Sequence, residues 1–462
     1  MPRQVASHQA RSHLFLPSRA PTNRKNFTMA DAVSEQSVLE TIKCISDGSL
    51  TPQQAISSAH ARAIAWEPTI HAYIHLPHDP PQATLGAGPL AGIAVGIKDL
   101  IDTADMPTSY GSRIFEGHQP TKDAWVVARL KDLSATVLGK TVTTELAWFE
   151  PGATRNPRNV EHMPGGSSSG SAAAVASGSV PVALGTQTYG SVLRPAAYCG
   201  VVGLKPTHGS ISLQGVNPIA GSLDHLGLFT RTVDDAAFVL SFLLGGPGAT
   251  PHAPFQVLAS GVTPFAAPRL AWLRPWDAPK MDDCQRMILE TSARVFAASG
   301  AVVEPFALPD AFNELPRLAK TICAAEAAVS FGHLVEHFPD KLSSHIKALV
   351  DQGRKISAPD YIAALAQRAD LQKRLPQAIS GFNAILTAPA TGEAPVGLSY
   401  TGDPGLCAPW TALGTPAISL PAGLGPTSLP LGLQLVTPFG EDMKLLRVAK
   451  WCEAAIARKV GS

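Results

Sequence analysis

Two serines within runs of small residues are the first candidates for chemistry in this sequence. Ser167 lies in a run at residues 165–171, and Ser191 ends a second run at residues 185–191. Glycine beside a hydroxyl residue lets the backbone come close to a substrate and lets several N–H groups converge on one point. Such runs can therefore hold a nucleophile together with a site that binds an oxyanion.

Flexible linkers are also rich in glycine and serine, so a linker is the alternative to be weighed. The two runs are followed by apolar, uncharged sequence that includes SAAAVA and CGVVGL. Solvated linkers do not carry such segments, because their residues stay in water. We therefore expect residues 163–207 to lie in the core, with the rest of the chain organised around them.

A lysine in an apolar segment is the third candidate. Lys98 interrupts a strand-like run within residues 88–112. It could lie at a strand end, where it would pair with Asp99 or extend to water. Neighbours on a strand point to opposite faces, however, so Asp99 is poorly placed to neutralise Lys98. A desolvated lysine without a carboxylate has a lowered pKa and can serve as a base.

Composition narrows the class of protein and its partners. Hydrophobic residues make up 45% of the 462 residues and charged residues only 16%, so the chain has to bury a large core. The net charge is +1 and no basic stripe follows the N-terminal tail, so we expect no nucleic acid as a ligand. The run AAFVLSFLLGG is shorter than the roughly 18 residues of a membrane helix, so we expect no membrane partner.

Metal and disulfide sites have no support in the sequence. The six cysteines are scattered without a CxxC spacing, and none of the 14 histidines stands in an HExxH motif. We expect no metal.

Local patterns along the chain predict the elements that have to position these residues. Residues 1–28 carry Arg, Lys, Ser and Pro without an acid and are expected to form a disordered tail. Apolar periodicity, caps and turn residues predict the rest. The expected elements are helices at 34–48, 51–65, 122–133, 282–299, 314–337 and 359–380, and strands at 71–75, 134–140, 267–276, 301–309 and 382–389.

Four motifs in order resemble the amidase signature family of serine hydrolases: GIKDL, PGGSSSGSAAAVA, LGTQTYGSVLRPAAYCGVVGLKPT and SLDHLGLFTRTVDDAA. The resemblance implies an α/β fold, an α/β/α sandwich in which helices cover a large central mixed β-sheet. It also implies a single domain at 29–462. The expected parts are a core signature at 88–245, a variable substrate-pocket region at 246–380, and closing strands and a helix at 381–462.

The same resemblance implies a Ser, cis-Ser, Lys triad and no cofactor. Lys98 matches the lysine, Ser167 the cis-serine and Ser191 the nucleophile. Backbone N–H groups would form the oxyanion hole. The residues implied for that hole are Thr188, Tyr189, Gly190 and Ser191, with Gly166, Ser168 and Arg194 in support.

The sequence departs from the commonest family pattern in three places. Where many members have TDTGGS, this chain has Gln187 in place of the acid and Tyr189 in place of a glycine. The arginine also falls one residue later, at Arg194. We expect the Tyr189 ring to lie beside the scissile bond and to affect the range of substrates.

A different serine is an alternative nucleophile. Gly166, Ser168 and Gly170 satisfy the GxSxG pattern of the nucleophile elbow. That elbow follows a strand, whereas residues 156–164 have the composition of a loop. Ser191 is therefore preferred.

The expected activity is hydrolysis of linear C–N bonds through an acyl-enzyme on Ser191. Amides, aryl esters and carbamates share the tetrahedral intermediate, so they are the expected small-molecule substrates. We expect a cytoplasmic monomer or homodimer. The alternative is an amidase-like subunit of a tRNA-dependent amidotransferase, which would work only inside a complex.

Overall fold

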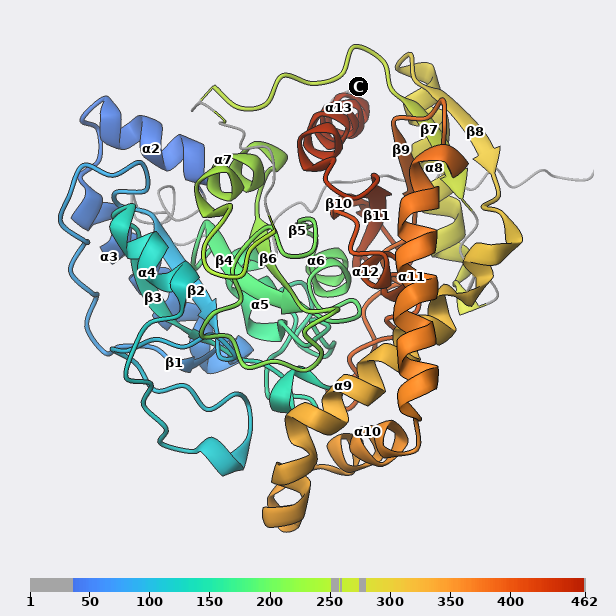
Figure 1. Ribbon diagram of the computed structural model, residues 1–462. Coiled ribbons are helices and arrows are strands. Elements are labelled where there is room, and N and C mark those ends of the chain that lie inside the picture. The colour runs from blue at the N-terminus through green and yellow to red at the C-terminus, as the bar shows by residue number, and fades with distance from the viewer. Residues whose placement is uncertain (1–35, 251–256, 258–259, 274–279, 461–462) are drawn as a thin grey trace, which may run out of the picture.

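An 11-stranded mixed sheet runs through the computed structural model, which describes residues 36–250, 257, 260–273 and 280–460 (Figure 1). The tail expected at residues 1–28 lies outside the described residues. The strands follow the order β1-β3-β2-β4-β6-β5-β10-β11-β9-β7-β8. Their bounds are β1 (Tyr73–His75), β2 (Ala94–Lys98), β3 (Thr136–Thr141), β4 (Val182–Gln187), β5 (Val202–Lys205), β6 (His225–Thr230), β7 (Arg269–Leu273), β8 (Val302–Phe306), β9 (Ala384–Thr387), β10 (Ala417–Leu424) and β11 (Pro430–Val436).

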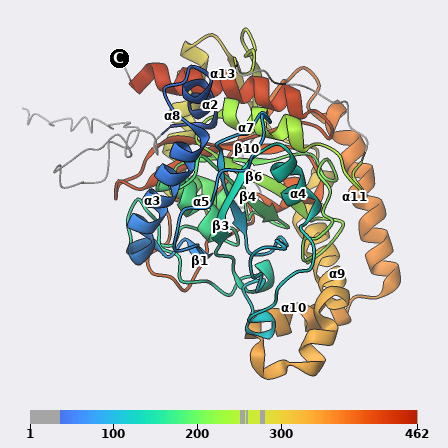
Figure 2. The same cartoon turned by 90° about the vertical axis from the view of Figure 1, so that its left-hand side faces the viewer.

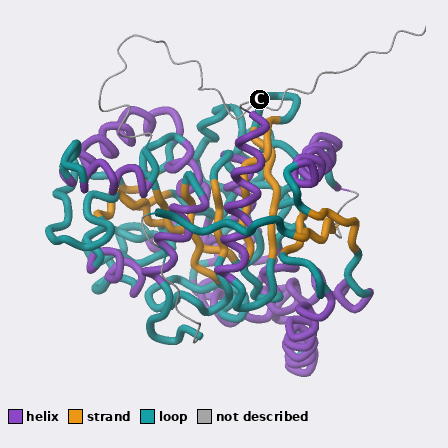
Figure 3. The backbone as a smooth tube through the Cα atoms, turned by 90° about the horizontal axis from the view of Figure 1, so that it is seen from above, coloured by secondary structure: helices purple, strands orange, loops and turns teal. Residues whose placement is uncertain are grey.

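Helices cover both faces of this sheet, with the strands running between them when the molecule is seen from above (Figure 3). Together with the mixed sheet, they confirm the expected α/β/α architecture. Their bounds are α2 (Val38–Ser46), α3 (Pro52–Ile70), α4 (Trp125–Asp132), α5 (Ser169–Ala176), α6 (Leu193–Cys199), α7 (Val233–Leu243), α8 (Asp283–Ala298), α9 (Leu315–His337), α10 (Ser344–Arg354), α11 (Ala358–Ala378), α12 (Ala408–Ala412) and α13 (Asp442–Val460).

Alternation along the central strands divides the core between the two faces. On β2, Val95 and Ile97 join one cluster, which α4, α7, α8 and α13 cover, and Figure 2 shows α13 lying across the molecule beside α7 and α8. Ala94 joins a second cluster, which α3, α5 and α6 cover on the opposite face. Side chains on a strand alternate between faces, so β2 is buried on both.

The expected elements are confirmed with two corrections. Helix α3 begins at its predicted Thr51 cap but runs to Ile70, past Pro68, where we expected it to have ended. Pro68 lies in the last turn, so the missing N–H removes one helical hydrogen bond without stopping the helix. Helix α10 was not predicted, although Ser343 caps it and Ile346, Leu349 and Val350 form its buried face.

One helix among the described residues is long and apolar enough to cross a membrane, by length and composition alone. It spans Asp310–His337 and includes α9. Half of its most apolar window is buried inside the protein, and Ile322 is fully buried there. Core helices of soluble proteins have the same features.

The pairing of β2 with β4 brings the candidate residues together. The two strands are parallel and hydrogen-bonded, with Ile97 opposite Leu184. Their C-terminal ends therefore lie at the same edge of the sheet. Lys98 ends β2, and the segment after Gln187 leads from β4 to Ser191.

Candidate active site

Lys98 is fully buried at the end of β2 and contacts two hydroxyl groups. Its Nζ lies 2.7 Å from both Ser167 Oγ and Thr186 Oγ1, and 3.5 Å from the carbonyl oxygen of Thr186. Burial lowers the pKa of Lys98 well below its ordinary value, and the charge of Asp224 partly offsets that effect.

A neutral amine can also make these contacts. Such an amine has two N–H groups and one lone pair. The Thr186 carbonyl oxygen can only accept, and the Thr186 hydroxyl can accept as well. When both N–H groups are donated to Thr186, the lone pair remains for the Ser167 hydroxyl. The geometry therefore allows Lys98 to take a proton from Ser167.

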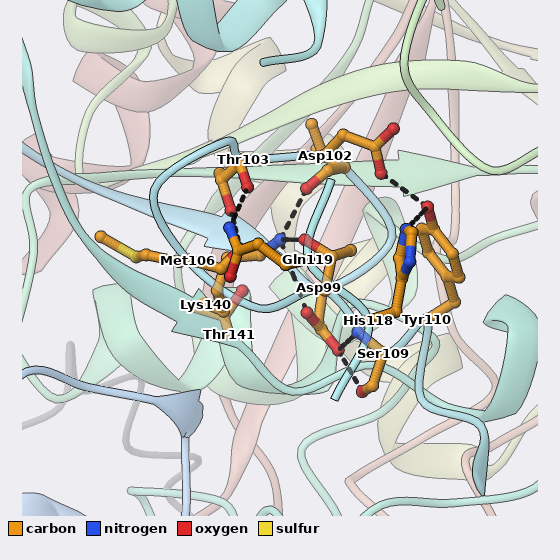
Figure 4. Close-up of polar contacts among 12 residues, drawn as sticks. Asp99, Asp102, Thr103, Met106, Ser109, Tyr110, His118, Gln119, Lys140 and Thr141 are labelled. Carbon is orange, nitrogen blue, oxygen red and sulfur yellow. Dashed lines mark hydrogen bonds and ion pairs between the residues drawn. The ribbon is translucent and has the colours of Figure 1, made fainter. Parts of the chain in front are cut away.

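Asp99, the neighbour of Lys98, is engaged elsewhere. Asp99 Oδ1 lies 3.5 Å from Lys140 Nζ, and Oδ2 accepts hydrogen bonds from the Ser109 hydroxyl at 2.6 Å and its N–H at 3.1 Å (Figure 4). Burial lowers the pKa of Lys140 to about 8, against the charge of Asp99. Lys98 thus neither pairs with Asp99 nor extends to water, which resolves the alternative considered from the sequence.

Ser167 lies in a loop that is held by Arg194. The Gly166–Ser167 peptide is cis, as the family resemblance implies. Arg194 Nη2 donates to the Gly166 carbonyl oxygen at 2.8 Å, and its Nε donates to the Thr401 carbonyl oxygen at 2.9 Å. Close packing requires a glycine at Gly165, which has φ +88° and whose added Cβ would lie 2.8 Å from the neighbouring backbone.

A short backbone segment, residues 188–191, connects β4 with Ser191. Among the described residues, no partner is recorded for the N–H groups of residues 188–191. Both Ser191 and Thr188 are largely buried. Successive free N–H groups form a concave site for an anion, and such donors stabilise an oxyanion more strongly away from water.

Ser167 and Ser191 both line one cavity. Three of its ten lining residues are aromatic, and the Trp148 and Tyr189 rings meet edge to face with centroids 5.5 Å apart. The lining consists of Ala147, Trp148, Phe149, Ser167, Thr188, Tyr189, Ser191, Arg194, Thr401 and Pro404. The cavity thus combines a hydroxyl pair with apolar walls, which suits an organic carbonyl compound.

The alternative nucleophile, Ser168, is placed differently. It is fully buried, its hydroxyl donates to the Thr186 carbonyl oxygen at 3.2 Å, and it accepts from the Thr186 N–H at 3.3 Å. Both contacts tie it to the backbone of β4. Ser168 does not belong to the described lining of the cavity.

Three polar residues of the site were missed in the sequence. Thr186 contacts Lys98, Asp224 accepts a hydrogen bond from Thr188, and Thr411 contacts the carbonyl oxygen of Tyr189. Thr186 and Asp224 lie within the motifs that carry the family resemblance, so those motifs could have pointed to them as site residues. Thr411 lies far along the chain in α12, and nothing in the sequence connected it with Ser191. Within the described ranges, no group of three or more His, Cys, Asp or Glu residues could hold a metal ion.

Comparisons with known proteins agree on one family. The amidase family profile matches residues 65–446. The A subunit of glutamyl-tRNA(Gln) amidotransferase from Rhodopirellula baltica is 33% identical over 473 residues, covering 89% of this chain and 94% of that protein. The solved structure of the corresponding A subunit from Thermotoga maritima gives a TM-score of 0.77 at 29% identity, covering 90% of this chain and 94% of that one. The structure of 6-aminohexanoate cyclic dimer hydrolase gives 0.82 at 27% identity, covering 92% and 97%.

These comparisons overturn one expectation. We expected a monomer or homodimer that acts on a small amide, ester or carbamate, with no nucleic acid as a partner. That prediction is wrong, because the curated relatives are named as one subunit of an amidotransferase whose name includes a tRNA. Net charge describes the whole chain, so a value of +1 does not exclude an enzyme in which other subunits contact RNA.

Proposed function

The chain belongs to the amidase family, and on this premise we propose that it hydrolyses a carboxamide C–N bond through an acyl-enzyme on Ser191. The observation that carries the proposal is the contact of Lys98 Nζ with Ser167 Oγ at 2.7 Å, in the cavity wall that also contains Ser191. A hydroxyl is a weak nucleophile until a base takes its proton, and a buried, neutral lysine can do so through a second serine.

In the proposed mechanism, Lys98 takes the Ser167 proton while Ser167 takes the Ser191 proton. Ser191 Oγ then bonds to the carbonyl carbon, and the N–H groups of residues 188–191 stabilise the negative oxygen. Collapse of this intermediate breaks the C–N bond, and the leaving amine receives the proton through Ser167. Water then attacks the acyl-enzyme by the same relay and releases the carboxylic acid.

We further propose that the chain works inside an amidotransferase complex, as one of its subunits. The support is that curated relatives of nearly the same length are named as the A subunit of glutamyl-tRNA(Gln) amidotransferase. An amidotransferase delivers amide nitrogen to an acceptor, so its hydrolytic component has to release ammonia from a primary amide. The substrate class of Ser191 would then be a primary amide such as glutamine.

The test combines isolation with assay. The tagged chain is purified from the organism that produces it, its companions are identified by mass spectrometry, and ammonia release from glutamine is measured before and after the companions are removed. We expect at least one companion protein and faster release in the complex. A Ser191→Ala preparation controls for contaminating amidases.

A panel of substrates separates the two parts of the proposal. The isolated chain is assayed with a p-nitroanilide, a phenyl ester and an aryl carbamate, which share the tetrahedral intermediate with amides. Rapid hydrolysis of the anilide by the isolated chain, unchanged by companions, would contradict the role in a complex and leave the Ser191 chemistry standing. No hydrolysis in any preparation would contradict both.

A further inference from the structure

We propose that Gln187 and Thr411 are positioning residues that hold the Tyr189–Gly190 peptide so that the Gly190 N–H faces the developing oxyanion. The inference rests on the proposed function of Ser191 and adds two side chains that do not line the cavity. It follows from a chain of hydrogen bonds that links β4 to α12 and then returns to the segment before Ser191.

The orientation of the Gln187 side chain is fixed by its partners. Gln187 is fully buried at the end of β4. Its Oε1 accepts from the N–H groups of Val192 at 2.8 Å and Leu193 at 3.1 Å, at the start of α6. An N–H can only donate, so the oxygen has to face α6 and the NH₂ group has to face the other way. Nε2 then donates to Thr411 Oγ1 at 2.9 Å.

The Thr411 hydroxyl continues this chain of hydrogen bonds toward Tyr189. Because its hydroxyl oxygen accepts from Gln187, its single hydrogen is free to donate. Two acceptors are in reach, the Tyr189 carbonyl oxygen at 2.7 Å and the Cys407 carbonyl oxygen at 3.3 Å. The shorter distance favours the bond to Tyr189. Thr411 is fully buried, so bulk water does not compete for this hydrogen.

The bond to Tyr189 fixes a peptide plane next to the nucleophile. In a trans peptide the C=O and N–H groups point in opposite directions. A carbonyl oxygen held toward Thr411 therefore turns the Gly190 N–H away from α12. No partner for that N–H is recorded among the described residues, so it remains available to an oxyanion.

A carboxylate on a side chain of the same length would not act in the same way. A carboxylate can accept from the N–H groups of α6 but has no hydrogen to donate. The Thr411 hydroxyl would then donate to the acid and turn away from Tyr189. The Gln187 amide accepts from the α6 N–H groups and donates to Thr411, which leaves the Thr411 hydrogen for the Tyr189 carbonyl oxygen.

The experiment measures how fast an alkyl fluorophosphonate labels Ser191, because this probe needs the same oxyanion site and no knowledge of the natural substrate. Gln187→Glu keeps size and the α6 contacts but reverses the bond to Thr411, and Thr411→Val removes the hydroxyl. Loss of one oxyanion donor costs about a hundred- to a thousandfold, so misorientation of one should slow labelling at least about tenfold in each variant. Thr411→Ser should stay within about threefold of the wild type.

Thr415→Val is the matched control. Thr415 is equally buried and its hydroxyl donates to the Trp410 carbonyl oxygen at 3.1 Å, but no bond from its side chain to residues 188–191 is recorded. It should label at the wild-type rate. The pH dependence of labelling should be unchanged in Thr411→Val, Thr411→Ser and Thr415→Val, since these variants add no charge near Lys98 and Ser167; a merely structural loss of the site would disturb it.

Wild-type labelling rates in both Gln187→Glu and Thr411→Val would overturn the inference and leave the proposed function intact. If Thr411→Val does not fold, as judged by its melting curve, Gln187→Glu decides alone. A wild-type chain that is not labelled at Ser191 would overturn the proposed function, and the positioning role with it.

Discussion

Thr188 and Asp224 are joined by a hydrogen bond in which the Thr188 hydroxyl donates to Asp224 Oδ1 at 2.5 Å. Asp224 Oδ2 accepts from the N–H groups of Ile219 and Ala220, each at 2.9 Å. Burial raises the pKa of Asp224 to about 6, and its charge raises the pKa of Lys98 in turn. One carboxylate therefore contacts the proposed oxyanion segment and acts electrostatically on the proposed base.

Asp224→Asn should move the pH profile of kcat/KM to lower pH. Without the negative charge, the Lys98 ammonium is less favoured and its pKa falls further, so the neutral base is present at lower pH. The Asn oxygen can still accept from the N–H groups of Ile219 and Ala220 while its NH₂ donates to the Thr188 hydroxyl oxygen, so the loss of unfolding free energy should be about 1 kcal/mol or less. The measurements are a pH–rate series and urea unfolding. A profile that stays in place would show that Asp224 does not act on the base.

Lys98→Met should lower the rate about a hundred- to ten-thousandfold while the chain stays folded, because it keeps the volume and removes the base. In the wild type, kcat/KM should rise with pH as the Lys98 ammonium loses its proton, since only the neutral amine has a lone pair for Ser167. Rates are measured on a p-nitroanilide that the wild type hydrolyses.

A second buried lysine is the control for Lys98→Met. Lys140→Met removes the partner of the buried Asp99, so it should cost about 3–5 kcal/mol of unfolding free energy and affect catalysis less than Lys98→Met does. A Lys98→Met enzyme of near-wild-type activity, together with a histidine variant that loses it, would mean that the base is a histidine.

Ser191→Ala should abolish turnover and fluorophosphonate labelling without loss of fold, because it removes the atom that bonds to the acyl group. Ser168→Ala should lose only its bonds to the Thr186 backbone and keep most of the activity. Mass mapping of the labelled peptide identifies the nucleophile directly. A label on Ser168 in the wild type would reverse the assignment.

Tyr189→Gly should change the relative rates of bulky and small acyl groups more than it changes stability, because the ring packs against Trp148 in the cavity wall. Tyr189→Phe keeps the ring and removes only the hydroxyl, so it should retain the wild-type preference. A series of p-nitroanilides from acetyl to benzoyl gives the comparison. Equal losses along the series would argue against a role in the pocket wall.

The positions of helices and strands could be predicted from sequence, because short motifs, apolar periodicity and capping residues involve neighbours along the chain. The fold class, the family and nearly all the predicted elements are confirmed. Thr411 could not be found in this way, because its role depends on α12 packing beside a segment 222 residues earlier. The catalytic roles of Lys98, Ser167 and Ser191, the domain boundaries and the cytoplasmic location stay predictions.

The alternation along β2 makes the site intolerant of small changes in strand length. Lys98 shares its face of the strand with Ala94, while Val95 and Ile97 face the other core. Inserting or deleting one residue within β2 would move the lysine to the wrong side of the sheet, whereas a change of two would preserve its side. A change of two keeps the side but moves the lysine about 7 Å along the strand, away from Ser167 and Thr186. The proposed chemistry therefore fixes both the side and the length of β2.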